Sequence, residues 1–149
     1  MKPYKPLEQL SIKYRGTVLH NMAYMETLMN YYIAEFFCGV DNHVKKDAMQ
    51  NLILGDDRMS LKPKIDVFVY ISKTHDLEWY KSFKGVFKEL KLELIHIMEQ
   101  RNIFAHRIID NDLIYNDEPT PEGAIRFLSF KNSINKIDYT PERFEELII

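Results

Sequence analysis

Three polar side chains near residue 100 have the chemistry that a catalytic or binding site needs. Arg101, Asn102 and His106 lie in the segment ELIHIMEQRNIFAHRIID, which is otherwise rich in apolar and helix-forming residues. Arginine carries a fixed positive charge on a planar fork of N–H donors, and histidine changes its charge near neutral pH. An arginine and a histidine can therefore bind an anion and transfer a proton, provided that both reach the same place.

The helix that carries these side chains is predicted to be long, from about Leu77 to Ile108. At about 100° per residue, one arc of this helix is apolar and should face a core; it contains Phe83, Phe87, Leu90, Leu94, Ile97 and Ala105. Arg101 falls in the middle of that arc, and His106 lies about 140° away from it. The two side chains can act together only from a helix end, across a cleft, or with a second chain.

An arginine in a core-facing arc needs an acidic partner, because an unpaired buried guanidinium is very costly. Glu26, at the edge of the apolar arc of the first helix, is the expected partner, with Asp66 as second choice. Such a pair can also be a packing device and nothing more. His106 has a similar alternative, since a helix C-terminus favours a positive charge, and Asn102 can be an ordinary surface amide.

Lysines form a separate stripe on the same helix. The stripe consists of Lys81, Lys84, Lys88 and Lys91. Asn102 and His106 continue it toward the end of the helix. A row of lysines is usually a solvated face, and the alternative is a track for the backbone of a nucleic acid.

Composition limits the class of protein. The 149 residues suit one domain with a real core, at 46% hydrophobic and 28% charged residues. A net charge of −2 gives no chain-wide basic field that would attract nucleic acid. The chain has one cysteine, Cys38, which is expected to be a small buried residue in a reducing cytosol. We find neither a signal-peptide core nor an apolar run long enough to span a bilayer, so we expect a cytoplasmic protein with no membrane partner.

No metal or cofactor is expected. The spacings typical of zinc ligands are missing among the histidines, which are His20, His43, His75, His96 and His106. The sequence also lacks the glycine-rich loops that hold phosphates in nucleotide-binding proteins.

Amphipathic periodicity predicts a first helix over residues 14–38. Its apolar positions follow at steps of three and four residues: Val18, Met22, Met25, Met29, Tyr32 and Phe36. Gly39 stands where a glycine commonly ends a helix.

Two more helices are predicted before the long one. The second begins after an N-cap at Asp41 or Asn42 and ends at Gly55. The third begins after Ser60, with Pro63 in its first turn, where a missing N–H is tolerated. The apolar positions over 65–71 suit a helix or a strand, and the neighbouring helices favour a helix.

The character of the sequence changes after residue 110. Short β-prone runs at Leu113–Tyr115 and Ile125–Phe130 predict a β-hairpin. A short last helix should follow, with Thr140 as N-cap and Pro141 in first position. We therefore predict a mainly α protein with one domain over 1–149, formed by a helical bundle (1–110) and a β-hairpin with a short helix (111–149).

The segment RNIFAH resembles the R-x4–6-H motif of the HEPN superfamily (higher eukaryotes and prokaryotes nucleotide-binding), in its RNxxAH form. The family carries this motif near the C-terminal end of a long helix in a bundle of four or five helices, and Arg101 to His106 fall at such a place. The resemblance covers about the first 110 residues, and RNIFAH is its specific part.

This resemblance implies a metal-independent endoribonuclease that cleaves single-stranded RNA, or a non-catalytic relative that binds RNA or a protein. Small members often belong to toxin–antitoxin or phage-defence systems, so an antitoxin protein is a possible partner. In the family, two motif helices meet in a homodimer and form one composite cleft. That arrangement would bring Arg101 and His106 together although they lie on different faces of one helix.

The resemblance also implies a role for each residue. His106 would act as general base or acid in the attack of a 2′-OH on the adjacent phosphorus. Arg101 would stabilise the phosphorane-like transition state, and Asn102 would donate a hydrogen bond to phosphate or orient His106. The product would be a 2′,3′-cyclic phosphate. Lys84, Lys88 and Lys91 would bind the RNA backbone.

Overall fold

The structure, a computed structural model, describes residues 4–56, 59–75, 78, 81, 84–110, 120–129 and 135–148. The described residues are mainly helical, with a small antiparallel sheet near the C-terminus and a short helix after it, so the predicted fold class is confirmed. The chain forms two compact units. Residues 22–99 form the helical unit, and residues 1–21 with 100–149 form the sheet unit. The single domain over 1–149 stays a prediction.

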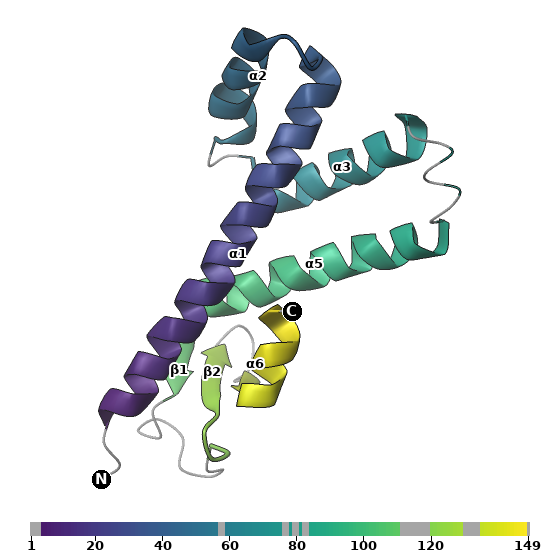
Figure 1. The fold of residues 1–149 in the computed structure, drawn as a ribbon. Helices are drawn as coiled ribbons and strands as arrows, with labels where there is room; N and C mark the ends of the chain where they lie inside the picture. Colours follow the sequence, from purple (N-terminus) through teal and green to yellow (C-terminus); the bar gives the residue numbers. More distant parts are fainter. Residues whose placement is uncertain are drawn as a thin grey trace. The chain divides into compact units, whose positions relative to one another are not determined.

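Figure 1 shows the helices of the helical unit. They pack through two apolar clusters. The helices are α1 (Tyr4–Cys38), which begins in the sheet unit, α2 (His43–Met49), the π-helix η1 (Gln50–Leu54), α3 (Leu61–His75) and α5 (Lys84–His106), which ends in the sheet unit. The first cluster joins α1, α3 and α5 through Met29, Ile65, Val69 and Leu94. The second joins α1, η1 and α3 through Ile33, Ala34, Leu54 and Ile71.

Helix ends follow the local chemistry of the sequence. The Oδ1 atom of Asn42 accepts a hydrogen bond from the backbone N–H of Lys45 at 3.2 Å, which confirms one of the two predicted N-caps. Gly39 has a φ of 81°, a conformation in which glycine meets no steric penalty, and the predicted end of α1 is confirmed.

One predicted helix differs from the observed one in its start, and another prediction, of a helix over a strand, is confirmed. α1 begins at Tyr4 rather than near residue 14, because Ser11 and Tyr14 extend its buried face toward the N-terminus. Residues 65–71 lie in α3, so the helix that we favoured over a strand is confirmed. No helix among the described residues has both the length and the hydropathy of a membrane span.

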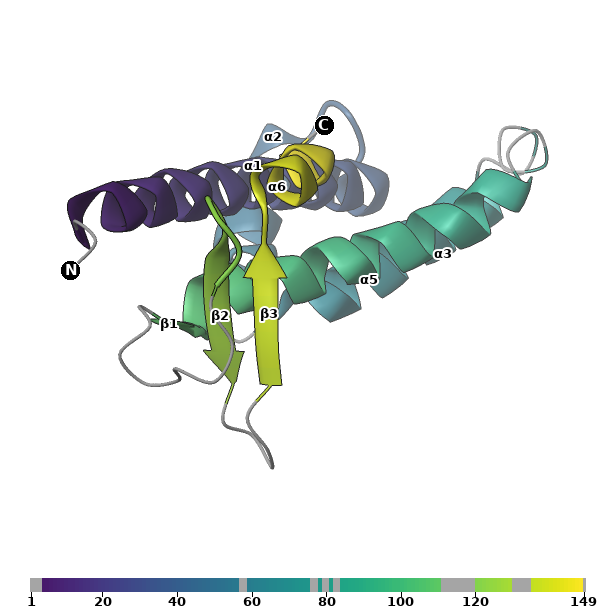
Figure 2. The same ribbon diagram turned by 90° about the horizontal axis from the view of Figure 1, so that it is seen from below.

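The sheet unit contains three antiparallel strands in the order β1-β2-β3 (Figure 2). The strands are β1 (Ile108–Asp110), β2 (Ile125–Ser129) and β3 (Asn135–Tyr139), and α6 (Pro141–Ile148) follows. Ile109 pairs with Phe127, which in turn pairs with Ile137.

The partners of β2 differ from the predicted ones. We predicted pairing with Leu113–Tyr115, a segment that lies outside the described residues, whereas β1 and β3 are the strands that pair with β2. Residues 108–110 were predicted within or just after the long helix, but α5 ends at His106 and the β-branched Ile108 and Ile109 continue as a strand.

An aromatic cluster forms the core of the sheet unit. The ring of Phe104 in α5 lies 5.0 Å from that of Phe127 and 4.7 Å from that of Tyr139. The ring of Phe144 in α6 stacks on the ring of Tyr14 in α1, with 3.5 Å between the ring centres. The N-cap of α6 is confirmed, because the Oγ1 atom of Thr140 accepts from the backbone N–H of Arg143, one turn into α6, at 3.3 Å.

Candidate active site

The three polar side chains of RNIFAH lie in the last two turns of α5, and all three are exposed. One guanidinium nitrogen of Arg101, Nη1, donates a hydrogen bond to Oδ1 of Asn102 at 3.3 Å. Arg101 and Asn102 are therefore held together at the surface of the helix.

The prediction that Arg101 lies in a core-facing arc is wrong. The buried positions in this part of α5 are Gln100, Ile103 and Phe104. Gln100 can take a buried place because its Oε1 atom accepts a hydrogen bond from the hydroxyl of Tyr139. Phe104 packs into the aromatic cluster, so this turn of α5 faces the core with the side that carries Gln100, Ile103 and Phe104. Arg101 lies on the exposed side and not, as predicted from the apolar arc, on the core-facing side.

His106 is the last residue of α5; it lies one turn after Asn102 on the same side of the helix and on a different side from Arg101. Among the described residues, a hydrogen bond joins Arg101 to Asn102, and none joins His106 to either side chain. This agrees with the angle of about 140° between positions 101 and 106 on a straight helix. One chain thus presents an arginine–asparagine pair and a separate histidine at the same helix end.

Both acidic residues named as partners of Arg101 are paired with lysines. Glu26 accepts from the ammonium group of Lys64, whose side chain is 3% exposed, against 31% for Glu26. Nζ of Lys91 lies 2.7 Å from Oδ1 of Asp66. We predicted that Glu26 supports Arg101 as the acidic partner of a buried guanidinium. Because Arg101 is exposed, its guanidinium needs no such partner.

The predicted lysine track is described only in part. Lys84 and Lys88 lie in α5, but their side chains are outside the described part of the structure. Lys91 forms the ion pair with Asp66, with exposed fractions of 41% and 49%. The hydrogen bond and the positive charge of Lys91 lower the pKa of Asp66. An exposed pair of this kind contributes at most about 1 kcal/mol, so a phosphate can compete for Lys91.

Two arginines that the sequence analysis did not select lie near the same helix end. Nη2 of Arg15, in α1, donates to the backbone oxygen of Arg107 at 2.7 Å. Arg107 directly follows His106, and its own N–H donates to the oxygen of Ile103 at 3.0 Å. The contact joins residues 92 positions apart in the sequence, so periodicity within one helix could not reveal it.

Side chains with metal-binding chemistry are scattered. Within the described ranges, no three residues among histidine, cysteine, aspartate and glutamate are grouped so that they could hold a metal ion. Cys38 lies against Met49, with 3.8 Å between the sulfur atoms.

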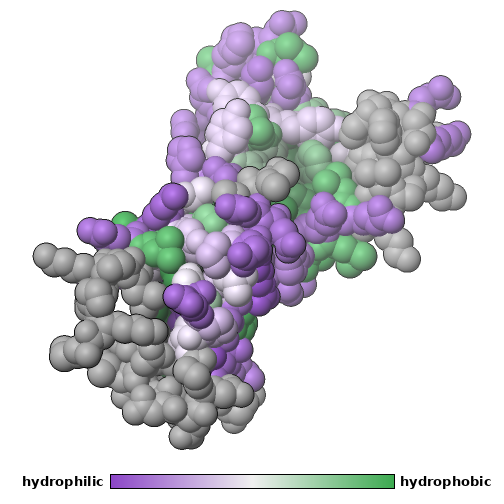
Figure 3. All heavy atoms as spheres, turned by 60° about the horizontal axis from the view of Figure 1, so that its bottom comes forward, coloured by the Kyte–Doolittle hydropathy of each residue, from purple (hydrophilic) through white to green (hydrophobic). Residues whose placement is uncertain are grey.

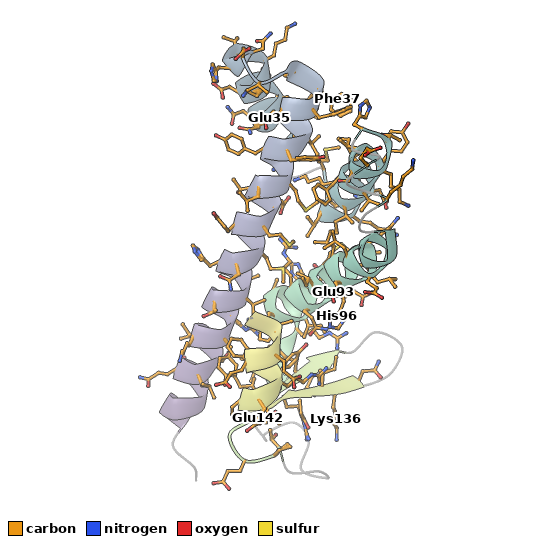
Figure 4. The ribbon with its side chains drawn as sticks, turned by 45° about the vertical axis from the view of Figure 1, so that its right-hand side comes forward. Glu35, Phe37, Glu93, His96, Lys136 and Glu142 are labelled. Atoms are coloured by element: carbon orange, nitrogen blue, oxygen red, sulfur yellow. The ribbon has the colours of Figure 1, made fainter. Side chains whose placement is uncertain are left out.

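Figure 4 labels Glu93 and His96, which are exposed on α5. On the face drawn in Figure 3, hydrophobic side chains occur among hydrophilic ones.

Comparisons with protein-family models, with curated proteins and with solved structures found no match. The HEPN resemblance therefore depends on the RNIFAH motif and its place on the chain, and it remains a prediction.

Proposed function

We propose that this protein is a metal-independent endoribonuclease that cleaves single-stranded RNA, with Arg101, Asn102 and His106 as its active residues. The observation that supports this most is the exposure of all three side chains at the C-terminal end of α5. An exposed arginine contributes little to packing. The main competing explanation, a buried ion pair that fixes helix packing, required Arg101 to be buried.

The proposed chemistry uses each side chain for one task. His106 removes the proton of a ribose 2′-OH, the oxygen attacks the adjacent phosphorus, and the bond from phosphorus to the 5′-oxygen breaks. Arg101 stabilises the negative charge that grows on the phosphate oxygens. Because Oδ1 of Asn102 accepts from Arg101, the amide N–H groups of Asn102 are available to donate to phosphate. The products are a 2′,3′-cyclic phosphate and a 5′-hydroxyl.

The proposal includes a cytoplasmic homodimer. Arg101 and His106 of one chain leave the helix in directions about 140° apart, so one chain alone does not surround a phosphate with both groups. Two copies of the α5 end facing each other would supply two arginines and two histidines to one cleft. The departing 5′-oxygen would take its proton from the protonated His106 that served as base, or from water. A role as a toxin with a cognate antitoxin, or in phage defence, is part of the same proposal.

The test is cleavage of a labelled single-stranded RNA by purified protein in the presence of EDTA. Arg101→Ala and His106→Ala should each lower the cleavage rate by about 10²–10⁴-fold, the usual range for a lost acid–base group. Their free energies of unfolding should differ from that of the wild type by about 0.5 kcal/mol or less, the range typical of surface substitutions. His96→Ala is the matched control, because His96 is an exposed histidine of the same helix.

Either of two results would contradict the proposal. One is cleavage by His106→Ala or Arg101→Ala at the rate of the wild type and of His96→Ala. The other is intact RNA after incubation with folded, inhibitor-free wild-type protein over a range of RNA sequences.

The alternative function is a non-catalytic module that binds RNA or a protein. Exposed apolar side chains on α1 and near α2 favour a protein partner; they include Tyr24, Leu28, Tyr31, Val44 and Leu52. Under this alternative, a complex forms without RNA cleavage, and Arg101→Ala changes affinity rather than a rate.

A further inference from the structure

In the sheet unit, the side chain of Arg15 lies against the backbone of Arg107. Nη2 of Arg15 donates to the backbone oxygen of Arg107 at 2.7 Å, which places the side chain of Arg15 beside the residue that follows α5. Three ion pairs of described residues are Lys64–Glu26, Lys91–Asp66 and Arg126–Asp138. None of these three pairs includes Arg15 or Arg107.

Each of the two arginines also has a buried nitrogen without an acceptor. Nε of Arg15 and Nη1 of Arg107 are buried, and neither donates a hydrogen bond to the protein. A buried donor left unpaired costs about 1–3 kcal/mol, and more when it carries charge. Two such donors, on residues that are in contact, call for an acceptor that none of the described residues supplies.

Both arginines lie near the aromatic cluster of the sheet unit. The guanidinium carbon of Arg15 lies 5.4 Å from the ring centre of Phe127, whose ring is 5.6 Å from that of Tyr139. Burial raises the pKa of Tyr139, while the positive charges of Arg143 and Arg107 lower it. Arg107 is thus close enough to Tyr139 to influence its hydroxyl, and both arginines border the same aromatic cluster.

The nearest pairing of opposite charge on the sheet is already complete. Asp138 accepts two hydrogen bonds from Arg126, at 2.7 and 2.8 Å, one to each carboxylate oxygen. Asp138 is therefore poorly placed to serve Arg15 or Arg107 as well.

We propose that Arg15 and Arg107 bind one phosphate group. A phosphate offers several oxygens to the two planar forks and can accept hydrogen bonds from the unpaired donors. Both residues are partly exposed, so an anion can approach them from solvent, and the two side chains turn on binding to present the buried nitrogens.

The phosphate has two possible sources, which are an RNA phosphodiester and free phosphate. The choice of RNA depends on the proposed ribonuclease function: Arg107 follows His106 directly, and a phosphate held there would fix RNA beside the catalytic histidine. The binding of phosphate itself does not depend on that function.

The first experiment is a titration of the folded protein with inorganic phosphate, followed by the NMR signals of the arginine Nε–H groups. The signals of Arg15 and Arg107 should shift in a saturable way. Arg15→Gln and Arg107→Gln should each weaken phosphate binding about tenfold or more. Lys13→Gln, which removes an exposed positive charge from the same helix, should leave it unchanged.

The second arm separates the two sources of phosphate. A short RNA without terminal phosphates is added to His106→Ala protein, in which the proposed cleavage is blocked. Shifts of the Arg15 and Arg107 signals support RNA as the ligand, even if the wild type proves to cleave nothing. Shifts with phosphate alone support the anion site and overturn its assignment to RNA. The wild-type titration needs no variant to fold, and unchanged Arg15 and Arg107 signals in it would overturn the site itself.

Discussion

Lys64 carries the buried charge of the helical unit. Its side chain is 3% exposed and donates to Glu26, which is 31% exposed. A lysine with this little exposure is tolerated only when it is paired, because the removal of an ammonium group from water is costly. Since Lys64 neighbours Ile65 in the first apolar cluster, this ion pair borders the core of the unit.

Removal of Glu26 should therefore destabilise the protein far more than removal of Arg101. We expect Glu26→Ala to lower the free energy of unfolding by about 3 kcal/mol, because the charge of Lys64 stays buried without a partner. The double variant Glu26→Leu with Lys64→Met should recover most of that loss. Urea unfolding followed by circular dichroism measures the difference, and equal effects of Glu26→Ala and Arg101→Ala would contradict this assignment.

Residue types were easier to recognise in the sequence than their environments. The spacing within RNIFAH identified Arg101, Asn102 and His106 as a set, and all three occur at one helix end. The sequence did not reveal that Arg101 is exposed, because burial of Gln100 depends on a hydrogen bond from Tyr139, 39 residues away. Apolar periodicity contains no information on such a partner.

At the scale of elements, the end of η1 depends on a glycine. The backbone N–H of Gly55 donates to the oxygen of Gln50 at 2.6 Å, the five-residue step of a π-helix. A Cβ atom at position 55 would lie 2.7 Å from that same oxygen. The φ of Gly55 is −84°, which other residues adopt readily, so the restriction is the close approach of the backbone.

Two glycine-to-alanine variants should then change stability in opposite directions. Gly55→Ala should destabilise the protein by about 1–3 kcal/mol, as in other overpacked sites. Gly16→Ala should stabilise it by about 0.5–1 kcal/mol, since Gly16 lies inside α1 and a Cβ atom there meets nothing within 4 Å. Thermal unfolding of the two variants checks this, and stabilisation by both would refute the role given to Gly55.

Elements defined by local chemistry were predictable, and those defined by distant pairing were not. Gly39, Asn42 and Thr140 mark helix ends through their own backbone or side chain, and the structure has each of them at that end. β1 and β3 are short and acquire their strand conformation from pairing with β2. β3 follows residues 131–134, and no strong strand signal distinguishes NKIDY from the polar segment around it. On β3 and α6, Figure 4 labels Lys136 and Glu142.

At the scale of the whole molecule, the proposed cleft requires two chains. If Arg101 of one chain acts with His106 of the other, a mixture of Arg101→Ala and His106→Ala proteins should regain activity, because heterodimers contain one intact arginine and one intact histidine. We expect a clear fraction of wild-type activity after the two inactive variants are mixed and allowed to exchange subunits. Sedimentation should give a mass about twice the 17.8 kDa of one chain. A monomeric active enzyme would contradict the composite cleft.

The weak net charge of −2 also has a consequence for the whole molecule. A chain without a strong basic field attracts RNA only through local positive groups. In the proposed enzyme these groups are Arg101, the lysines of α5, and Arg15 with Arg107. RNA binding, and with it cleavage, should for this reason weaken as the salt concentration increases. The slope of the logarithm of the affinity against the logarithm of the salt concentration should be proportional to the number of phosphates contacted, which is small.

The most direct test of the central claim is the chemical nature of the 3′ end that the wild-type protein leaves on a single-stranded RNA in EDTA. Attack by the 2′-OH, with His106 as base, predicts a 2′,3′-cyclic phosphate, which mass spectrometry of the fragments identifies. Fragments that end in a free 3′-hydroxyl, or RNA that stays intact, would contradict the account.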